Sequence, residues 1–172
     1  MKKTLLLTVC FALLGCAGND TNESKAVLYS TQTNKPIGIV EFTQTRAGLL
    51  VDVDLKNLPA GDHGFHIHEN PDCSNITDKE GNIHYAQGAG GHYDPLNTGK
   101  HLGPNGNGHK GDLPYLTADG NGTVETQFYL KNTTASELKN KSIIVHSAGD
   151  NYSDTPEVSG GGGARIACGI IR

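Results

Sequence analysis

Residues 49–56 read Leu49-Leu50-Val51-Asp52-Val53-Asp54-Leu55-Lys56, where four apolar side chains alternate with the residues between them. A period of two is typical of a β-strand with one buried face. The segment 124–130 shows the same alternation. Further β-like runs occupy 26–32, 37–43, 64–68, 142–146 and 164–171, separated by turn signals rich in Pro, Gly and Asn. No segment has a sustained helical period. The pattern predicts an antiparallel β-sandwich or β-barrel.

The length and composition fit one globular domain. The chain has 172 residues, which leaves little room for a second domain. Its 23 glycines follow no Gly-X-Y repeat, and this excludes a collagen-like protein. The formal net charge of −4 argues against a general nucleic-acid-binding protein. Eight histidines and four cysteines then call for an explanation.

The N-terminus has the shape of a secretory signal. Lys2 and Lys3 precede a mostly apolar run that is too short to span a bilayer comfortably. The run ends in Leu13-Leu14-Gly15-Cys16, which resembles a bacterial lipobox and predicts cleavage before Cys16 and lipidation of its thiol. An ordinary signal peptide with a chance Cys is the alternative. The expected divisions are a lipoprotein-type signal peptide at 1–15, the lipidated Cys and a tether at 16–25, and the folded domain at 26–172.

This assignment places the protein in the periplasm, with a lipid at Cys16 as its only membrane attachment. Ala17, rather than Asp, follows the lipidated residue, and this favours the outer membrane. Removal of residues 1–15 leaves 12 Lys and Arg against 18 Asp and Glu, a net charge of −6.

The same processing accounts for the cysteines. Cys10 leaves with the signal and Cys16 takes the lipid, so Cys73 and Cys168 remain. In a chain bound for an oxidising compartment, we expect these two to form a disulfide. The chain-entropy model gives a closed loop of about 95 residues roughly 4–5 kcal/mol of stabilisation. No free thiolate is then left for catalysis or metal binding.

Two long segments do not have the pattern of strands. One runs over 69–112 and is rich in Gly, Asn, Pro and His, and the other runs over 147–163 and ends in four consecutive glycines. Loops of this length inside a compact domain are usually functional or disordered. Because the first holds Cys73 and several histidines, we expect it to be a functional loop.

Six histidines and one carboxylate form a candidate metal site. His66 and His68 are two residues apart on an expected strand, so both imidazoles point to the same face. The other candidates are His92, His101, His109, Asp112 and His146. Imidazole suits zinc, copper, iron and nickel, but a blue-copper site would lack its Cys and its usual Met. Seven ligands exceed one tetrahedral site, so we expect two metals or a shared ligand. A His-Glu-x-x-His metalloprotease motif is absent, because Asp72 stands four residues after His68.

Four motifs, in order along the chain, resemble those of the Cu/Zn superoxide dismutases, and the resemblance covers roughly 26–172. Tyr93 and the run at 149–152 are similar to the bacterial secreted branch of that family. The motifs are Gly64-Phe65-His66-Ile67-His68-Glu69, Gly90-Gly91-His92-Tyr93-Asp94-Pro95, His109-Lys110-Gly111-Asp112-Leu113-Pro114 and Gly163-Ala164-Arg165-Ile166-Ala167-Cys168-Gly169.

The resemblance implies an all-β fold: a Greek-key, eight-stranded antiparallel β-barrel or sandwich with two long functional loops. It implies one copper and one zinc per subunit, with His92 as a ligand shared by both metals. Asp150 matches an acid that links His66 to His101, and Arg165 matches the arginine beside the copper. Cys73 and Cys168 match the family's disulfide. The implied copper ligands are His66, His68, His92 and His146, and the implied zinc ligands are His92, His101, His109 and Asp112.

The implied activity is dismutation of superoxide, a small anionic substrate, to O₂ and H₂O₂ by redox cycling of copper. This would protect against superoxide outside the cytoplasm. In the family mechanism His92 leaves copper on reduction and takes up a proton for the peroxide, so it is both ligand and general acid. Arg165 would dock the anion. The alternatives are a metal-binding or buffering β-sandwich without turnover and an adhesion sandwich with structural zinc.

Some residues have no role from these arguments. His63 precedes the strand of His66 at a turn, where we expect a surface histidine, and His84 lies in the loop before His92. Lys79 and Lys110 are candidate charges for steering an anionic substrate, against the alternative of merely solvated lysines. Monomer and homodimer both stay open.

Overall fold

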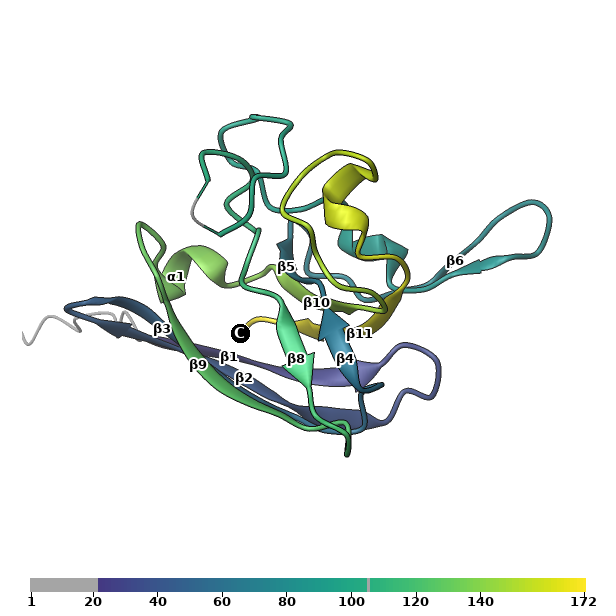
Figure 1. The fold of residues 1–172 in the computed structure, drawn as a ribbon, viewed down its shortest axis with the longest axis horizontal. Helices are drawn as coiled ribbons and strands as arrows, with labels where there is room; N and C mark the ends of the chain where they lie inside the picture. The colour runs from purple at the N-terminus through teal and green to yellow at the C-terminus, as the bar shows by residue number, and fades with distance from the viewer. Residues whose placement is uncertain (1–21, 105) are drawn as a thin grey trace, which may run out of the picture.

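The computed structural model describes residues 22–104 and 106–172, and these form a curled antiparallel sheet (Figure 1). Its seven strands lie in the order β5-β10-β11-β1-β2-β3-β9. Their bounds are β1 Glu23–Ser30, β2 Pro36–Thr45, β3 Gly48–Leu55, β5 Phe65–His68, β9 Val124–Leu130, β10 Ser142–His146 and β11 Arg165–Ile170.

A second pair of strands forms a small sheet of its own, which the chain connects directly to this one. β4 (Gly61–His63) pairs with β8 (Leu116–Ala118), and β4 is separated from β5 only by Gly64. If β4 and β5 are counted as one strand, eight antiparallel strands follow one another from β8 to β9. The connections from β3 to β4 and from β9 to β10 join strands that are not neighbours, as in a Greek key. The all-β prediction is confirmed.

The period-two pattern of β3 predicts its burial correctly. Leu49, Val51, Val53 and Leu55 are buried, whereas the residues between them are partly or fully exposed. Facing residues of β2 and β9 pair with them across the ladders. The buried members join Phe42, Phe65, Ile67 and the other core residues inside the curl.

Several short elements, among them β8 and α1, escaped prediction because they are too short to show a period. β8 has three residues, and α1 (Ala135–Leu138) has four. α1 is defined instead by a capping box, in which the side chain of Thr134 accepts from Glu137 N and the Glu137 carboxylate accepts from Thr134 N.

The long loop at 69–112 contains regular structure of its own. A small hairpin of β6 (Ile76–Thr77) and β7 (Ile83–His84) projects from the body of the molecule, and the 3-10 helix η1 (Gln87–Ala89) follows it (Figure 1). The loop at 147–163 contains the 3-10 helix η2 (Val158–Gly161). Both loops rise above β5 and β10, on the side away from β2 and β3 (Figure 1).

The N-terminal predictions fall largely outside the described residues. The signal peptide, Cys16 and most of the tether belong to 1–21, and β1 already begins at Glu23, inside the predicted tether. Among the residues that the structure describes, no helix is long and apolar enough to cross a membrane.

Candidate metal centre

β5 and β10 place three histidines on one face of the sheet. Both faces of β5 are buried: Phe65 and Ile67 join the core, while His66 and His68 point to the opposite side, beneath the loops. In the ladder with β10, Ile144 pairs with His66, so the even-numbered residues of β10 share this face. His146, two residues beyond Ile144, ends β10 after a register shift.

The loop at 69–112 brings the remaining candidates against the edge of β5. Isolated β-bridges join His68 to His92 and His66 to Asp112. Between them Tyr93 N donates to Ile67 O at 2.8 Å, and Ile67 N donates to Gly111 O at 2.9 Å. These backbone bonds position two loop segments beside β5, which is why ligands far apart in sequence converge.

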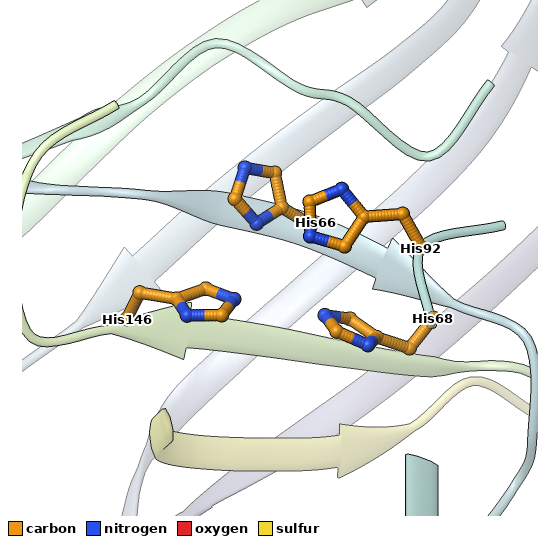
Figure 2. A group of neighbouring side chains, drawn as sticks. All are labelled: His66, His68, His92 and His146. Atoms are coloured by element: carbon orange, nitrogen blue, oxygen red, sulfur yellow. The ribbon is translucent and has the colours of Figure 1, made fainter. Parts of the chain in front are cut away.

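The seven predicted ligands gather into two overlapping groups. In each group the potential ligand atoms lie within 4.8 Å of one another. Figure 2 shows the four rings of the first group turned toward a common space. His92 belongs to both groups, as a shared ligand would. The groups are His66, His68, His92 and His146, and His92, His101, His109 and Asp112.

Five of these imidazoles have a buried ring nitrogen without a hydrogen-bond partner. A buried polar atom without a partner is costly, so a cluster of them needs an explanation. A metal ion explains all five, because each such nitrogen, once deprotonated, offers a lone pair to the space that the groups enclose. The atoms are His66 Nδ1, His68 Nε2, His101 Nδ1, His109 Nδ1 and His146 Nε2. The residues therefore fit a pair of metal ions.

The second ring nitrogen of most of these histidines faces an oxygen. A ligating histidine usually passes its other N–H to such a partner, which fixes the tautomer and the ring orientation. Asp150 faces two of them, with Oδ2 at 2.6 Å from His66 Nε2 and Oδ1 at 2.8 Å from His101 Nε2. Backbone carbonyls face two more: Gly90 O lies 3.0 Å from His68 Nδ1, and Gly163 O lies 3.3 Å from His146 Nδ1.

The second group has the spacing of tetrahedral zinc ligands. Asp112 Oδ1 lies 3.0 Å from Nδ1 of His92, 3.0 Å from Nδ1 of His101 and 3.4 Å from Nδ1 of His109. Ligands about 2.0 Å from one tetrahedral ion lie about 3.3 Å apart. Because His92 turns Nδ1 toward Asp112, its Nε2 is left for the first group.

Burial keeps three histidines of the first group neutral. Desolvation lowers the pKa of His66 to about 4, although the hydrogen bond to Asp150 opposes it. Desolvation also lowers the pKa of His146 to about 3 and that of His68 well below its usual value. Neutral imidazole is the form that binds a metal.

The carboxylates dominate at the second group. Burial alone would lower the pKa of His101, but the nearby carboxylates of Asp112 and Asp150 outweigh it and raise this pKa to about 9. Burial alone would raise the pKa values of Asp112 and Asp150, but their histidine partners hold both well below the usual range. Both acids are therefore ionised and available to ligate or orient.

Arg165 stands at the start of β11 beside the first group. Its charge acts on His68 and His146 and contributes to their lowered pKa values. The guanidinium donates to Ala86 O at 2.8 Å and to Gly90 O at 2.7 Å. Gly90 O thus contacts both Arg165 and the ring of His68.

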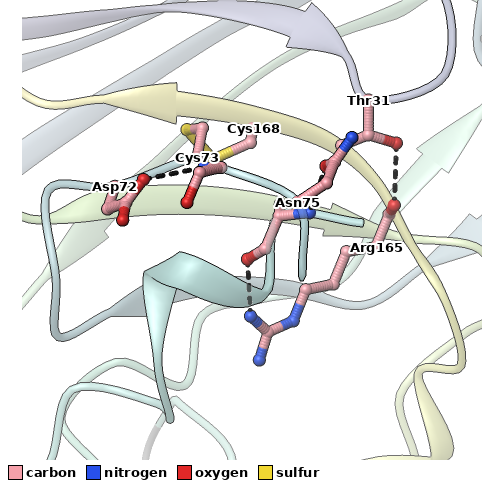
Figure 3. The surroundings of a disulfide bond; sticks show 8 residues. Thr31, Asp72, Cys73, Asn75, Arg165 and Cys168 are labelled. Atoms are coloured by element: carbon pink, nitrogen blue, oxygen red, sulfur yellow. Dashed lines mark hydrogen bonds between the residues drawn. A yellow bond between two sulfur atoms is a disulfide. The ribbon is translucent and has the colours of Figure 1, made fainter. Parts of the chain in front are cut away.

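The predicted disulfide joins Cys73 in the long loop to Cys168 in β11, with a Cα–Cα distance of 5.8 Å (Figure 3). Because Cys168 is three residues after Arg165, the bridge holds the loop close to the strand that carries the arginine. Lys110, a candidate steering charge, forms an ion pair with Glu137.

The structure corrects one expectation and adds a residue to the site. His63 is 1% exposed rather than on the surface. Its Nδ1 lies 2.7 Å from His146 O, and its Nε2 lies 2.8 Å from Pro59 O. The period of two could have predicted this burial, since His63 shares its side of the strand with Phe65 and Ile67. His84 is exposed, and its ring contacts Asp78 at 3.0 Å.

Comparison with known proteins gives one consistent result. Residues 37–171 match the family described as copper/zinc superoxide dismutase. The Cu-Zn superoxide dismutase of Brucella abortus is 50% identical over 142 residues, which are 82% of each chain. The structure of a Cu/Zn superoxide dismutase from Brucella abortus has a TM-score of 0.80 and 46% identity, over 87% of this chain and 99% of that one. The solution structure of the monomeric copper, zinc superoxide dismutase from Salmonella enterica has a TM-score of 0.74 and 42% identity, over 87% of this chain and 99% of that one.

Proposed function

Because the chain belongs to the copper/zinc superoxide dismutase family, we propose that its seven clustered side chains divide between one copper and one zinc. The activity is the dismutation of superoxide: two superoxide anions and two protons give O₂ and H₂O₂. The five partnerless imidazole nitrogens carry the assignment. Copper would be held by His66, His68, His92 and His146, and zinc would be held by His92, His101, His109 and Asp112.

Bound copper supplies the one-electron acceptor and donor of the two half-reactions, and bound zinc supplies a fixed, redox-inert charge. Arg165 docks the anion. Its guanidinium has five N–H donors, and two of its nitrogens are engaged by Ala86 O and Gly90 O. The remaining donors are available to a small anion beside the first histidine group.

His92 has a role in proton transfer, and Asp150 orients the rings of two histidines. His92 would hold a proton at Nε2 and could donate it to the reduced substrate as a general acid, while its Nδ1 faces Asp112 Oδ1 at 3.0 Å. Asp150 accepts from His66 and His101 together, so one carboxylate sets the tautomer of a ligand in each group.

Metal content and activity test this assignment together. Protein loaded with copper and zinc should dismutate superoxide. His146→Ala should lose activity and copper but keep zinc, because His146 belongs only to the first group. His109→Ala should lose zinc first, and His84→Ala is the matched control on an exposed histidine. Inactivity of the fully loaded wild type, or full activity of His146→Ala, would overturn the proposal.

We also propose that the protein is a periplasmic lipoprotein, which lipidated Cys16 holds to a bacterial membrane. The outer membrane is the favoured one. The disulfide supports an oxidising compartment. Cys16→Ser should abolish the lipid modification, seen by mass spectrometry of the N-terminal peptide, and release the protein from the membrane fraction. A wild-type protein that is wholly soluble in the periplasm would contradict the anchor.

The homodimer stays a prediction alongside the monomer. The Salmonella enterica enzyme is described as monomeric, and this concerns that protein. Light scattering on residues 17–172 during size exclusion measures the mass of this chain directly. A concentration series then separates a stable homodimer from a monomer.

A further inference from the structure

The side chain of Arg165 donates to the backbone carbonyl of a residue that has an unusual conformation. One of the two carbonyls that accept from its guanidinium belongs to Ala86. Ala86 has φ 48° and ψ 30°, the left-handed region that residues other than Gly rarely adopt. Its side chain is fully buried in a small cluster with Ala89, Ile144 and Cys168. Some contact must hold this alanine in a conformation that it does not prefer.

Asn75 supplies that contact. Its side-chain oxygen Oδ1 accepts from Ala86 N at 2.9 Å, across 11 residues of chain. Asn75 precedes β6 and Ala86 follows β7, so the bond closes the base of the projecting hairpin. The amide of Asn75 thereby fixes the peptide plane on one side of Ala86, and the guanidinium of Arg165 uses the carbonyl on the other side.

A disulfide connects the segment that carries Asn75 to the strand that carries Arg165. Asn75 is two residues after Cys73, whose disulfide partner Cys168 lies in β11 with Arg165. Figure 3 shows Asn75 beside the disulfide and Arg165. Ser74 O also accepts from Gly88 N at 3.0 Å, so the two sides of the hairpin base are joined twice.

We propose that Asn75 is a positioning residue for Arg165, acting through the left-handed Ala86. This inference rests on the proposed role of Arg165 in docking the anion. Without the acceptor on Asn75, Ala86 relaxes toward a commoner backbone conformation, and its carbonyl, which then keeps only the 3.2 Å bond from Ala89 N as a backbone restraint, shifts away from the guanidinium. Arg165 then keeps only Gly90 O, and its guanidinium is free to swing about that single bond.

Chemical modification of the metal-free protein is the first test. Phenylglyoxal modifies arginine side chains, and peptide mass spectrometry reports its rate at Arg165 alone. Asn75→Ala should raise that rate about 3- to 10-fold, the range expected when one hydrogen bond is lost. Asn75→Asp keeps an oxygen acceptor in place and should react at close to the wild-type rate. Asn82→Ala, which removes a side-chain bond to Asp78 at the far end of the hairpin, is the matched control.

Anion affinity of the copper- and zinc-loaded protein is the second test. Azide is a small monovalent anion, and its binding is followed by visible absorption. Asn75→Ala should raise the azide Kd about 3- to 10-fold, with metal content and disulfide unchanged, whereas Asn82→Ala should not.

The outcomes separate this inference from the proposed function. Wild-type rates and azide affinity in Asn75→Ala would overturn the role of Asn75, as would a fast rate in Asn75→Asp. Loss of copper or free thiols in Asn75→Ala would overturn it too, because the effect would then arise from the metal site or the fold. A loaded wild type without dismutase activity would defeat the proposed function, yet the modification of metal-free protein would still decide whether Asn75 holds Arg165.

Discussion

His63 Nδ1 lies 2.7 Å from the backbone carbonyl oxygen of His146, so a buried side chain of β4 holds the end of β10 where a predicted copper ligand emerges. The other ring nitrogen lies 2.8 Å from Pro59 O, in the turn before β4. One imidazole therefore ties a turn, two strands and a ligand together.

Replacement of His63 should weaken both the fold and the first metal group. His63→Ala leaves a cavity and removes the ring that contacts two backbone carbonyls, so the free energy of unfolding should fall by about 2–4 kcal/mol. Copper affinity should fall more than zinc affinity, because His146 belongs only to the first group. Urea unfolding and chelator competition measure the two effects. His84→Ala, at an exposed site, should change stability by less than about 0.5 kcal/mol. Equal losses of copper and zinc would contradict a role through His146.

Asp150 should matter equally to both metals. Asp150→Asn keeps the shape of the side chain but replaces one acceptor oxygen by an NH₂ donor, so it cannot accept from His66 and His101 together. Loss of such a partner typically costs about 10- to 100-fold in metal affinity, and we expect this for copper and for zinc. Competition with a chelator for each metal checks it. Asp119→Asn, in a distant turn, is the control. An effect on one metal alone would argue against the bridge.

The candidate metal ligands could be predicted from the sequence, whereas the contacts that the loops make could not. His66 and His68 could be found because imidazoles two apart on a strand share a face, whereas the ligand sets came from the resemblance to the family motifs. His63 could have been placed by the same period, but its position after a turn outweighed that signal. Asn75 and Glu137 could not be found, because their contacts depend on a left-handed alanine and a four-residue helix. Neither feature leaves a periodic trace.

The stability of the metal-free protein should depend on pH in both directions around about 6.5. His66 and His146 have folded pKa values of about 4 and about 3, below the value near 6.5 in unfolded chains. The unfolded state therefore binds more protons, and stability is lost as the pH falls from about 6.5 toward 4. A displacement of that size is worth roughly 3 kcal/mol for one histidine.

His101 acts in the opposite direction. Its folded pKa of about 9 lies above the unfolded value, so its contribution is full below about 6.5 and is lost as the pH rises toward 9. Urea unfolding of the metal-free, disulfide-intact protein between pH 4.5 and 9 measures the loss of stability on the acid side and on the alkaline side. Each unit of pKa displacement corresponds to ~1.4 kcal/mol. His146→Ala should reduce the acid limb, to which His66 still contributes, and leave the alkaline limb unchanged. A wild-type curve without an acid limb would contradict the buried neutral histidines.

Glu137, in α1, should restrain the long loop at 69–112, which carries the predicted zinc ligands. Its Oε1 accepts from Tyr93 Oη at 3.1 Å and pairs with Lys110, and these two residues directly follow His92 and His109. The ammonium of Lys141 lies 4.1 Å from the centre of the Tyr93 ring and adds a cation–π contact. One carboxylate in α1 thus restrains the chain next to two predicted zinc ligands.

Glu137→Gln removes the charge but keeps an oxygen for Tyr93, so it should release zinc about 3- to 10-fold faster into excess chelator. The free energy of unfolding should fall by no more than about 1 kcal/mol, because the ion pair with Lys110 is partly solvated. Tyr93→Phe should add to the effect on zinc release, since it removes the other contact to the same oxygen. Glu125→Gln, on the exposed face of β9, is the matched control. Zinc release that is unchanged in both Glu137→Gln and Tyr93→Phe would show that the loop keeps its ligands in place without α1.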